Sequence, residues 1–166
     1  YDSVFYAKLY PGENEYMRNI IELYISNQRE DGQLPFTIMD RKFLPGKTEE
    51  VVRYTHIQEC VSFASVCLEA YNILKDKEFL RACYDAAAKW VHWIEKHRMT
   101  QNKGLIEMFC GFDTGHDNSG RVTDIGCPDA VVIDGVWQNA DVLPPEDGIT
   151  PVIAVDMNCN FYGNLI

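Results

Sequence analysis

The stretch DKEFLRACYDAAAKWVHWIEKHR, residues 76–98, has the clearest structural pattern in the chain. Its apolar side chains recur at spacings of three and four residues, which is typical of an amphipathic helix. The predicted buried face consists of Phe79, Leu80, Cys83, Ala86, Ala87, Trp90, Val91 and Ile94. Charged residues between them are predicted to face solvent: Asp85, Lys89, Glu95 and Lys96. We therefore predict a helix over 76–98, with Trp90 and Trp93 in the core.

Two preceding segments show the same periodicity. The first, 13–31, has Tyr16, Ile20, Leu23 and Tyr24 at helical spacing, with Gly32 as a natural stop. The second, 55–74, has its main apolar face at Ile57, Cys60, Val61, Ala64, Cys67, Leu68, Tyr71 and Leu74. Because so few residues separate 55–74 from 76–98, these two helices are predicted to be antiparallel neighbours.

The remaining segments lack that regular pattern. Residues 33–53 contain several turn signals and are predicted to be an irregular connection. From 99 to 153 the chain is rich in Gly, Asp and Pro, and loops of this length are usually functional or disordered. Its many apolar residues favour an ordered functional loop, with a short hairpin near 130–138. A last helix is predicted over 156–166, with Asp156 or Asn158 as its N-cap.

Composition and charge restrict the function further. The 166 residues suffice for one domain with a hydrophobic core, and no apolar run approaches the roughly 20 residues of a membrane-spanning helix. Of the formal net charge of −10, most falls in 104–166, which has ten acidic residues and one basic residue. Such a surface would repel nucleic acid and anionic membranes, so neither is an expected partner. It would suit a neutral, hydroxyl-rich ligand, although acidity that merely keeps the protein in solution is the alternative.

The six cysteines form no CxxC pair, which argues against a zinc site built from thiolates. Cys60, Cys67 and Cys83 fall on the predicted apolar helix faces, where a free thiol acts as a small hydrophobe. This usage favours a reducing compartment and therefore a cytoplasmic location.

The segment GFDTGHDNSGR, residues 111–121, concentrates chemically active side chains between three glycines. Asp113, Asp117 and Arg121 are each four residues apart and supply acid, acceptor and counter-charge. A carboxyl group near an aromatic wall such as Phe112 can retain its proton, because desolvation disfavours the charged form. The structural alternative is an Asx turn at Asp117 and Asn118. A calcium loop is disfavoured, because Asn118 stands where that loop requires Gly.

These residues resemble a known family. GHDNSGR is similar to the G-x-D-N-S-P-R signature of glycoside hydrolase family 63 and its mannosylglycerate hydrolase relatives, and more loosely to the trehalase motif S-G-W-D-F-S-S-R. PVIAVDMNCNFYGNL resembles the P-V-D-L-N-A-x-L segment of the same families, and NQREDGQLPF resembles their Q-x-x-D-G-x-L-P turn. The sequence departs from the signature at Gly120, where Pro is usual.

The resemblance implies an all-α fold, in which residues 1–166 form part of an (α/α)6 barrel and further chain supplies the remainder. It implies an exo-acting, inverting glycosidase that cleaves an oligosaccharide or disaccharide, specifically a short α-glucoside or α-mannoside. Asp117 would be the general acid, and the general base would be a downstream Glu that this chain does not contain. No metal or other cofactor is needed for this chemistry.

The remaining site residues are expected to contact the sugar or shape its pocket. Arg121, Asn118 and Gln58 are predicted binding residues, because the resemblance puts Arg121 near the sugar subsite and Gln58 at the substrate pocket. Phe112 is a predicted pocket wall, and Asp113 a pocket or structural residue. Trp137 is either a platform for sugar stacking or a buried anchor of the loop.

Two other functions stay open at this point. A sugar epimerase on a similar helical barrel would use histidines for proton transfer, and here His56 and His116 would have to perform it. A non-catalytic carbohydrate-binding helical module is the other possibility.

Overall fold

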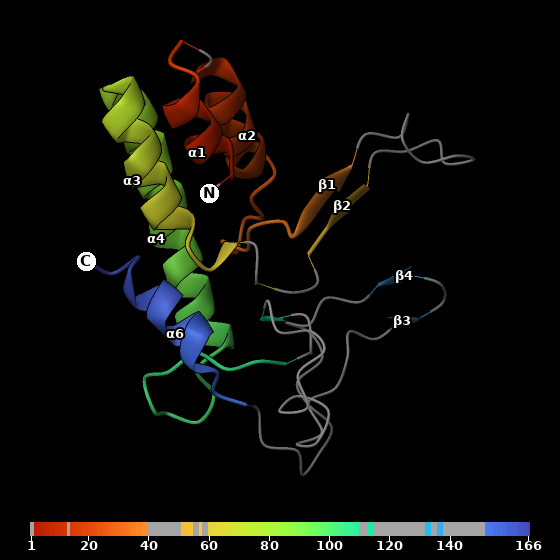
Figure 1. Ribbon diagram of the computed structural model, residues 1–166. Helices are drawn as coiled ribbons and strands as arrows, with labels where there is room; N and C mark the ends of the chain where they lie inside the picture. The colour runs from red at the N-terminus through yellow and green to blue at the C-terminus, as the bar shows by residue number, and fades with distance from the viewer. Residues whose placement is uncertain are drawn as a thin grey trace.

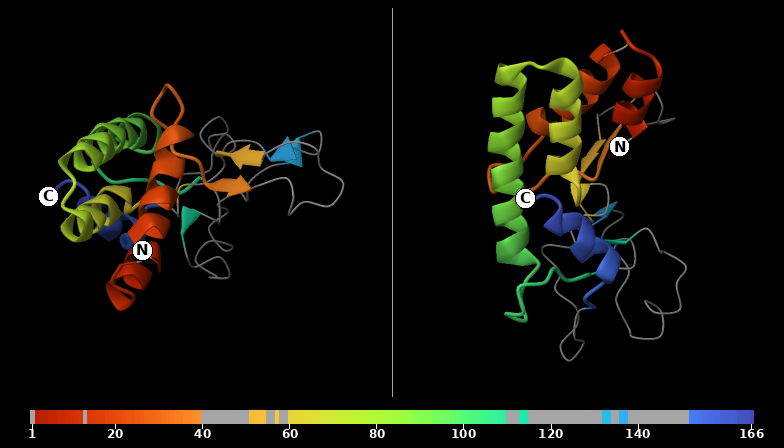
Figure 2. Two further views of the ribbon diagram at one scale, coloured as in Figure 1. Left: turned by 90° about the horizontal axis from the view of Figure 1, so that it is seen from above. Right: turned by 60° about the vertical axis from the view of Figure 1, so that its left-hand side comes forward.

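The computed structural model describes residues 2–12, 14–39, 51–54, 57, 60–109, 113–114, 132–133, 136–137 and 152–166. The elements in these residues are α1 (Asp2–Leu9), α2 (Asn14–Ser26), β1 (Thr37–Met39), β2 (Val51–Arg53), α3 (Phe63–Leu74), α4 (Lys77–His97), β3 (Val132–Ile133), β4 (Val136–Trp137) and α6 (Val155–Tyr162). Helices α1 to α4 pack together, and α6 lies near the C-terminal end of α4 (Figures 1 and 2). The described part of the chain is thus mostly helical. None of its helices is both long and apolar enough to cross a membrane.

Helix α4 confirms the prediction for 76–98 to within one residue at each end. Trp90 and Trp93 are both 1% exposed, and their rings stack with centroids 5.2 Å apart. The four charged residues predicted to face solvent are exposed. Side by side with α4 runs α3, joined to it by Lys75 and Asp76, as predicted for antiparallel neighbours (Figure 2). Lys75 ends α3 in the left-handed conformation at φ 55°.

The prediction of a helix over 55–74 is wrong in its first part, because α3 begins at Phe63. Ile57, Cys60 and Val61 are buried as their spacing predicted, but their backbone groups bind other segments. The Ile57 N–H donates to the Asp113 carboxylate, and the Cys60 carbonyl accepts from the Trp90 indole N–H. These groups are therefore not available to an α-helical ladder. Among the described residues, the buried Cys60, Cys67 and Cys83 form no disulfide, consistent with small hydrophobes in the core.

Helices α1 and α2 form a pair that packs on α3. Helix α2 ends at Ser26, short of the predicted residue 31, and it buries Met17 and Ile21, whereas Tyr16 is 56% exposed. No pattern in the sequence predicts α1 (Asp2–Leu9). Its apolar residues are distributed around the helix, so Val4 and Ala7 are buried while others remain exposed, and no amphipathic stripe marks it.

The prediction that 33–53 is irregular is wrong for β1 and β2, whereas residues 33–36 are irregular and residues 40–50 lie outside the described residues. The two strands pair antiparallel, with Thr37 opposite Arg53 and Met39 opposite Val51. Three-residue strands are too short to show a clear alternation in the sequence, so their pairing is set by the fold. The hairpin predicted near 130–138 is confirmed, because β3 and β4 pair with Val132 opposite Trp137.

The last helix, α6, begins at Val155 and ends at Tyr162, with three turn residues after it, so the predicted range 156–166 is too long. Its N-cap is Ala154, and both residues predicted for that position lie inside the helix. Asp156 and Asn158 instead point their polar groups toward other segments of the chain.

The turn after α2 brings the QREDGQLPF segment against α4. Gln28 Nε2 donates to the carbonyls of Gly32, at 2.8 Å, and Ala86, at 2.9 Å. Gly32 has φ 103°, and a Cβ built on it would lie 2.5 Å from the Lys89 carbonyl oxygen. The close approach of this turn to α4 therefore requires glycine.

We expect the backbone strain in Gly32→Ala to lower the free energy of unfolding by about 1–3 kcal/mol. The clash with the Lys89 carbonyl adds to this loss. Gly12→Ala is the matched control, because Gly12 has a similar φ of 106° but nothing within 4 Å of the added Cβ. Urea denaturation of both variants measures the difference. Equal losses would show that the contact with α4 is not tight.

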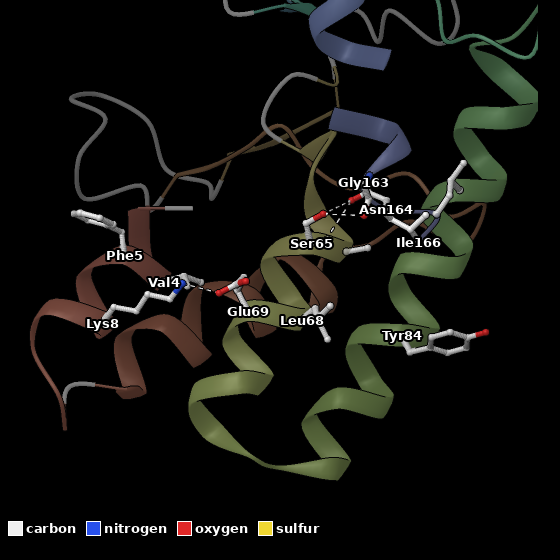
Figure 3. Close-up of a pocket in the computed structure, with 12 residues that line it drawn as sticks. Val4, Phe5, Lys8, Ser65, Leu68, Glu69, Tyr84, Gly163, Asn164 and Ile166 are labelled. Atoms are coloured by element: carbon white, nitrogen blue, oxygen red, sulfur yellow. Dashed lines mark hydrogen bonds and ion pairs between the residues drawn. The ribbon is translucent and has the colours of Figure 1, made fainter. Parts of the chain in front are cut away.

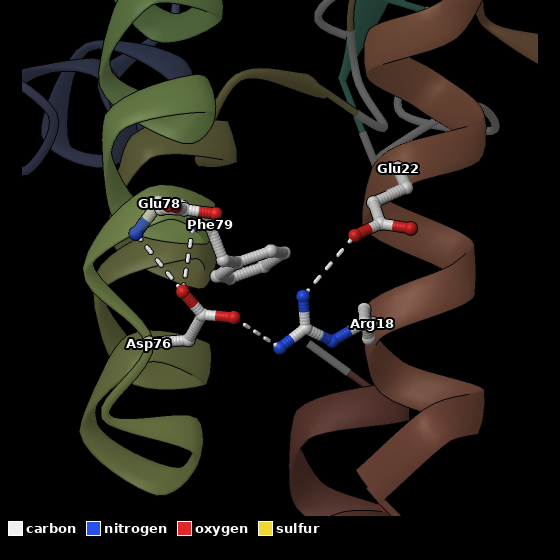
Figure 4. Close-up of polar contacts among 5 residues, drawn as sticks. All are labelled: Arg18, Glu22, Asp76, Glu78 and Phe79. Carbon is white, nitrogen blue, oxygen red and sulfur yellow. Dashed lines mark hydrogen bonds and ion pairs between the residues drawn. The ribbon is translucent and has the colours of Figure 1, made fainter.

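A polar contact joins α2 to the start of α4 (Figure 4). Asp76 caps α4, because its Oδ1 accepts from the backbone N–H groups of Glu78, at 2.9 Å, and Phe79, at 3.1 Å. Its Oδ2 accepts from Arg18 Nη2 at 2.7 Å. The Arg18 guanidinium, followed by these backbone N–H groups, holds the pKa of Asp76 below its usual range.

This lowered pKa predicts a pH-dependent contribution to stability. The pKa of Asp76 in the folded protein lies below its unfolded value of about 3.9. The charged carboxylate therefore makes its full contribution to the stability of the fold above a pH of about 3.9. This contribution is lost as the pH falls through the folded pKa. We expect Asp76→Ala to unfold at a lower temperature than wild type at pH 7, with a smaller difference in acid. Thermal unfolding between pH 7 and pH 2 tests this, with Asp85→Ala on the exposed side of α4 as control. A difference in unfolding temperature between Asp76→Ala and wild type that increases in acid would contradict the prediction.

Candidate functional site

A buried carboxylate organises the start of the long loop. Asp113 is fully buried, and its Oδ2 accepts from Arg98 Nη1 at 2.5 Å and from the Phe109 N–H at 2.7 Å. Its Oδ1 accepts from the Ile57 N–H at 3.0 Å. The Phe109 ring lies 4.4 Å from the Arg98 guanidinium carbon. This carboxylate thus joins the end of α4, the segment before α3 and the start of the loop.

The two ends of the long loop meet beside α6. Met108 donates from its backbone N–H to the Val152 carbonyl at 2.8 Å in an antiparallel bridge. The Asn158 side chain accepts from the Ile106 N–H at 2.8 Å and donates to the Ile106 carbonyl at 3.0 Å. We call residues 106–109, 113–114 and 152–158, with Arg98 and Ile57, the loop base.

Next to Asp113, Thr114 is also held. It is 1% exposed, and its hydroxyl donates a hydrogen bond to Asp156 Oδ2 on α6. Two consecutive residues are therefore bound on different sides, one by α4 and one by α6.

Glu107 is a second buried carboxylate in the loop base, and no motif in the sequence marks it. It accepts from the Thr100 N–H and hydroxyl, at 3.1 and 2.7 Å, and from the Gln101 N–H at 2.7 Å. Its own N–H donates to the Arg98 carbonyl at 2.8 Å. Glu107 therefore stabilises the turn after α4. No periodic pattern in the sequence marks Arg98 or Glu107 as buried, because their partners are brought together by the turn after α4 and by the contact with Asp113.

A surface groove of about 950 Å³ lies away from the loop base (Figure 3). It is lined by α1, α3, Tyr84 of α4 and the residues after α6. Lys8 and Glu69 form an ion pair at its edge, and Ser65 donates to the Gly163 carbonyl. Its lining includes none of the predicted site residues, and Phe5, Tyr84 and Ile166 are largely exposed.

Comparison with protein families identifies the chain. The family model for the mannosylglycerate hydrolase MGH1-like glycoside hydrolase domain matches residues 2–152, which include the helices α1 to α4 and the loop base up to Val152. The chain belongs to this family. The resemblance drawn from GHDNSGR is thereby confirmed at the level of the family. Comparisons with curated proteins and with solved structures gave no match.

Membership in the MGH1-like glycoside hydrolase family implies a helical toroid and a carbohydrate substrate. Of the site residues predicted from the sequence, Asp113 is the one whose side chain the structure describes. Its contacts favour a structural role over direct contact with sugar. For Trp137 the structure describes the backbone, in β4. The others lie outside the described residues: Asp117, Asn118, Arg121, Gln58 and Phe112.

Proposed function

We propose that this MGH1-like domain is the acid-bearing part of an exo-acting, inverting glycosidase that cleaves a short α-glucoside or α-mannoside. The observation that supports this most directly is the family match over residues 2–152, which contains GHDNSGR at 115–121. The domain belongs to an (α/α)6 barrel, in which helix pairs such as α3 and α4 would form the wall.

In the proposed reaction, the Asp117 carboxyl donates its proton to the glycosidic oxygen as the bond from that oxygen to the anomeric carbon breaks. A water molecule attacks the anomeric carbon from the opposite face and gives its proton to a second carboxylate. In inverting enzymes the two carboxyl groups are about 6.5–9.5 Å apart, which leaves room for the water.

The second carboxylate is assigned to neither buried acid of the loop base. Glu107 and Asp113 both accept hydrogen bonds from backbone N–H groups, and Asp113 also binds Arg98. A general base needs access to water, and these two carboxylates are fully buried. The base is therefore expected to be the later Glu that the family resemblance implies.

Arg121, Asn118 and Gln58 are proposed to bind the sugar hydroxyls, with Phe112 as a pocket wall. Trp137 lies at the end of the β3–β4 hairpin. For it, the proposal is a stacking platform, and anchoring of the loop is the alternative.

The function is tested by incubating the full-length protein with α-linked glucose and mannose disaccharides and following the products by proton NMR. We expect a new reducing end, released first as the β-anomer. Initial release of the α-anomer would contradict inversion. A free N-acylated amino sugar is the control for an epimerase, which would convert it without releasing a reducing end. Saturable binding with no product would indicate a carbohydrate-binding module.

A further inference from the structure

We propose that Asp113 and Thr114 are positioning residues that present the Asp117 carboxyl to the glycosidic oxygen, with Arg98 acting through Asp113. The proposal rests on the proposed function, because it assumes that Asp117 is the general acid. Neither positioning residue is expected to touch the sugar.

Three segments of the chain meet at the Asp113 carboxylate. Its oxygens accept from the Arg98 guanidinium, the Phe109 N–H and the Ile57 N–H, which belong to three different parts of the chain. A carboxylate held by several donors in a buried site has little freedom to move. The backbone at residue 113 is therefore fixed relative to α4.

Thr114 adds a constraint on a different side. Its hydroxyl binds Asp156 on α6, whereas Asp113 binds Arg98 at the end of α4. Anchoring one residue leaves the chain free to pivot, but anchoring two consecutive side chains to different helices does not. Only two residues, Gly115 and His116, separate Thr114 from Asp117. A displacement of Asp113 or Thr114 would therefore also displace the Asp117 carboxyl, because only two residues lie between Thr114 and Asp117.

The energetic reason for such a device is the strict geometry of proton transfer. A general acid must lie within hydrogen-bond reach of the oxygen that it protonates. A displacement of about 1 Å in a catalytic group can reduce turnover by about 10²-fold. In this proposal the placement of the acid comes from the attachment of the two described residues just before it, Asp113 and Thr114.

The test compares Asp113→Asn with Glu107→Gln in the full-length protein. Both changes convert a fully buried carboxylate of the loop base to an amide, but Glu107 binds residues 100 and 101 instead of the segment that leads to Asp117. Each variant is assayed on α-linked disaccharides and on α-glucosyl and α-mannosyl fluoride. Fluoride departs as an anion and needs little protonation, whereas the sugar leaving group requires the acid.

For Asp113→Asn we expect kcat on the disaccharide to fall about 10²-fold, with KM within roughly threefold of wild type. Its kcat on the glycosyl fluoride should fall less than about tenfold, as expected for loss of acid catalysis alone. Glu107→Gln should change both substrates by the same factor. A variant that only lowers the amount of folded enzyme would also reduce turnover of both substrates by the same factor. The ratio of fluoride turnover to disaccharide turnover therefore separates a positioning effect from a loss of stability. Equal ratios in the two variants would overturn the proposal.

Thr114→Val is the second variant, in case Asp113→Asn does not fold by circular dichroism. It removes the hydroxyl that binds Asp156 but leaves the buried ion pair of Arg98 and Asp113 intact. Thr114→Ser retains that hydroxyl. We expect the ratio of fluoride to disaccharide turnover to rise about tenfold in Thr114→Val and to stay unchanged in Thr114→Ser. An unchanged ratio in Thr114→Val overturns the proposal. If Asp117→Asn itself leaves disaccharide turnover intact, the proposed function fails, and this outcome is distinct from failure of the positioning role.

Discussion

Asp117→Asn is expected to reduce disaccharide turnover by about 10²–10⁴-fold, the usual contribution of a positioned general acid. The amide is similar in size to the carboxyl group but cannot give a proton to the leaving oxygen. Because the change is nearly isosteric, the unfolding temperature should stay close to that of wild type. Steady-state kinetics and thermal unfolding of the full-length protein measure both effects.

Asp124→Asn is the control for this variant, because it removes a carboxylate from the same acidic segment but outside GHDNSGR. We expect its turnover to remain within about twofold of wild type, because Asp124 belongs to none of the motifs that carry a proposed role. Glycosyl fluoride turnover by Asp117→Asn should be far less impaired than disaccharide turnover. Unchanged disaccharide turnover in Asp117→Asn would eliminate the assignment of the acid.

Arg98→Met is expected to have the largest effect on stability, a loss of about 3–5 kcal/mol in the free energy of unfolding. It leaves the fully buried Asp113 carboxylate without its cation, while Met occupies part of the volume of the arginine stem. It also removes the guanidinium from the face of Phe109. Urea denaturation monitored by tryptophan fluorescence measures the loss.

Lys8→Met is the matched control for Arg98→Met. It also removes a cation from an ion pair, but the side chains of Lys8 and Glu69 are 51% and 42% exposed. Exposed pairs contribute at most about 1 kcal/mol, so this variant should be nearly neutral. A loss in Arg98→Met no larger than in Lys8→Met would show that the buried pair does not stabilise the loop base.

The double variant Arg98→Met/Asp113→Leu should not recover the lost stability. In some proteins, apolar residues replace a buried ion pair without loss. Here Asp113 also accepts from the N–H groups of Ile57 and Phe109, and leucine would leave both donors unpaired. Each buried unpaired donor costs about 1–3 kcal/mol. Full recovery in the double variant would mean that these hydrogen bonds contribute little.

The parts of the fold that were predictable are those with long local patterns. Helix α4 matched its predicted range because its apolar stripe extends over 21 residues and Asp76 caps it locally. The β3–β4 hairpin was also predicted. In contrast, α1 was missed because it lacks an amphipathic stripe, and β1 and β2 were missed because three residues are too few for a pattern.

For the candidate site, a motif and a family resemblance predict Asp117 as the acid; the family is confirmed, and the role of Asp117 stays a prediction. The loop base could not be predicted in the same way. Nothing near Arg98 indicates that it would be buried, and its partner Asp113 lies 15 residues away. Asp113 was recognised as a pocket or structural residue, and its contacts favour the structural role.

The amino-acid sequence by itself determined the helical hairpin of α3 and α4, the buried face of α4 and the family, since these depend on local spacing and on short motifs. The tertiary structure alone decided that α3 begins at Phe63, and that Asp113 joins Arg98 to Ile57, 56 residues before it. The physical reason is that buried polar groups must find partners wherever the folded chain brings them together. Such pairings depend on the whole packed arrangement and leave no periodic trace along the chain.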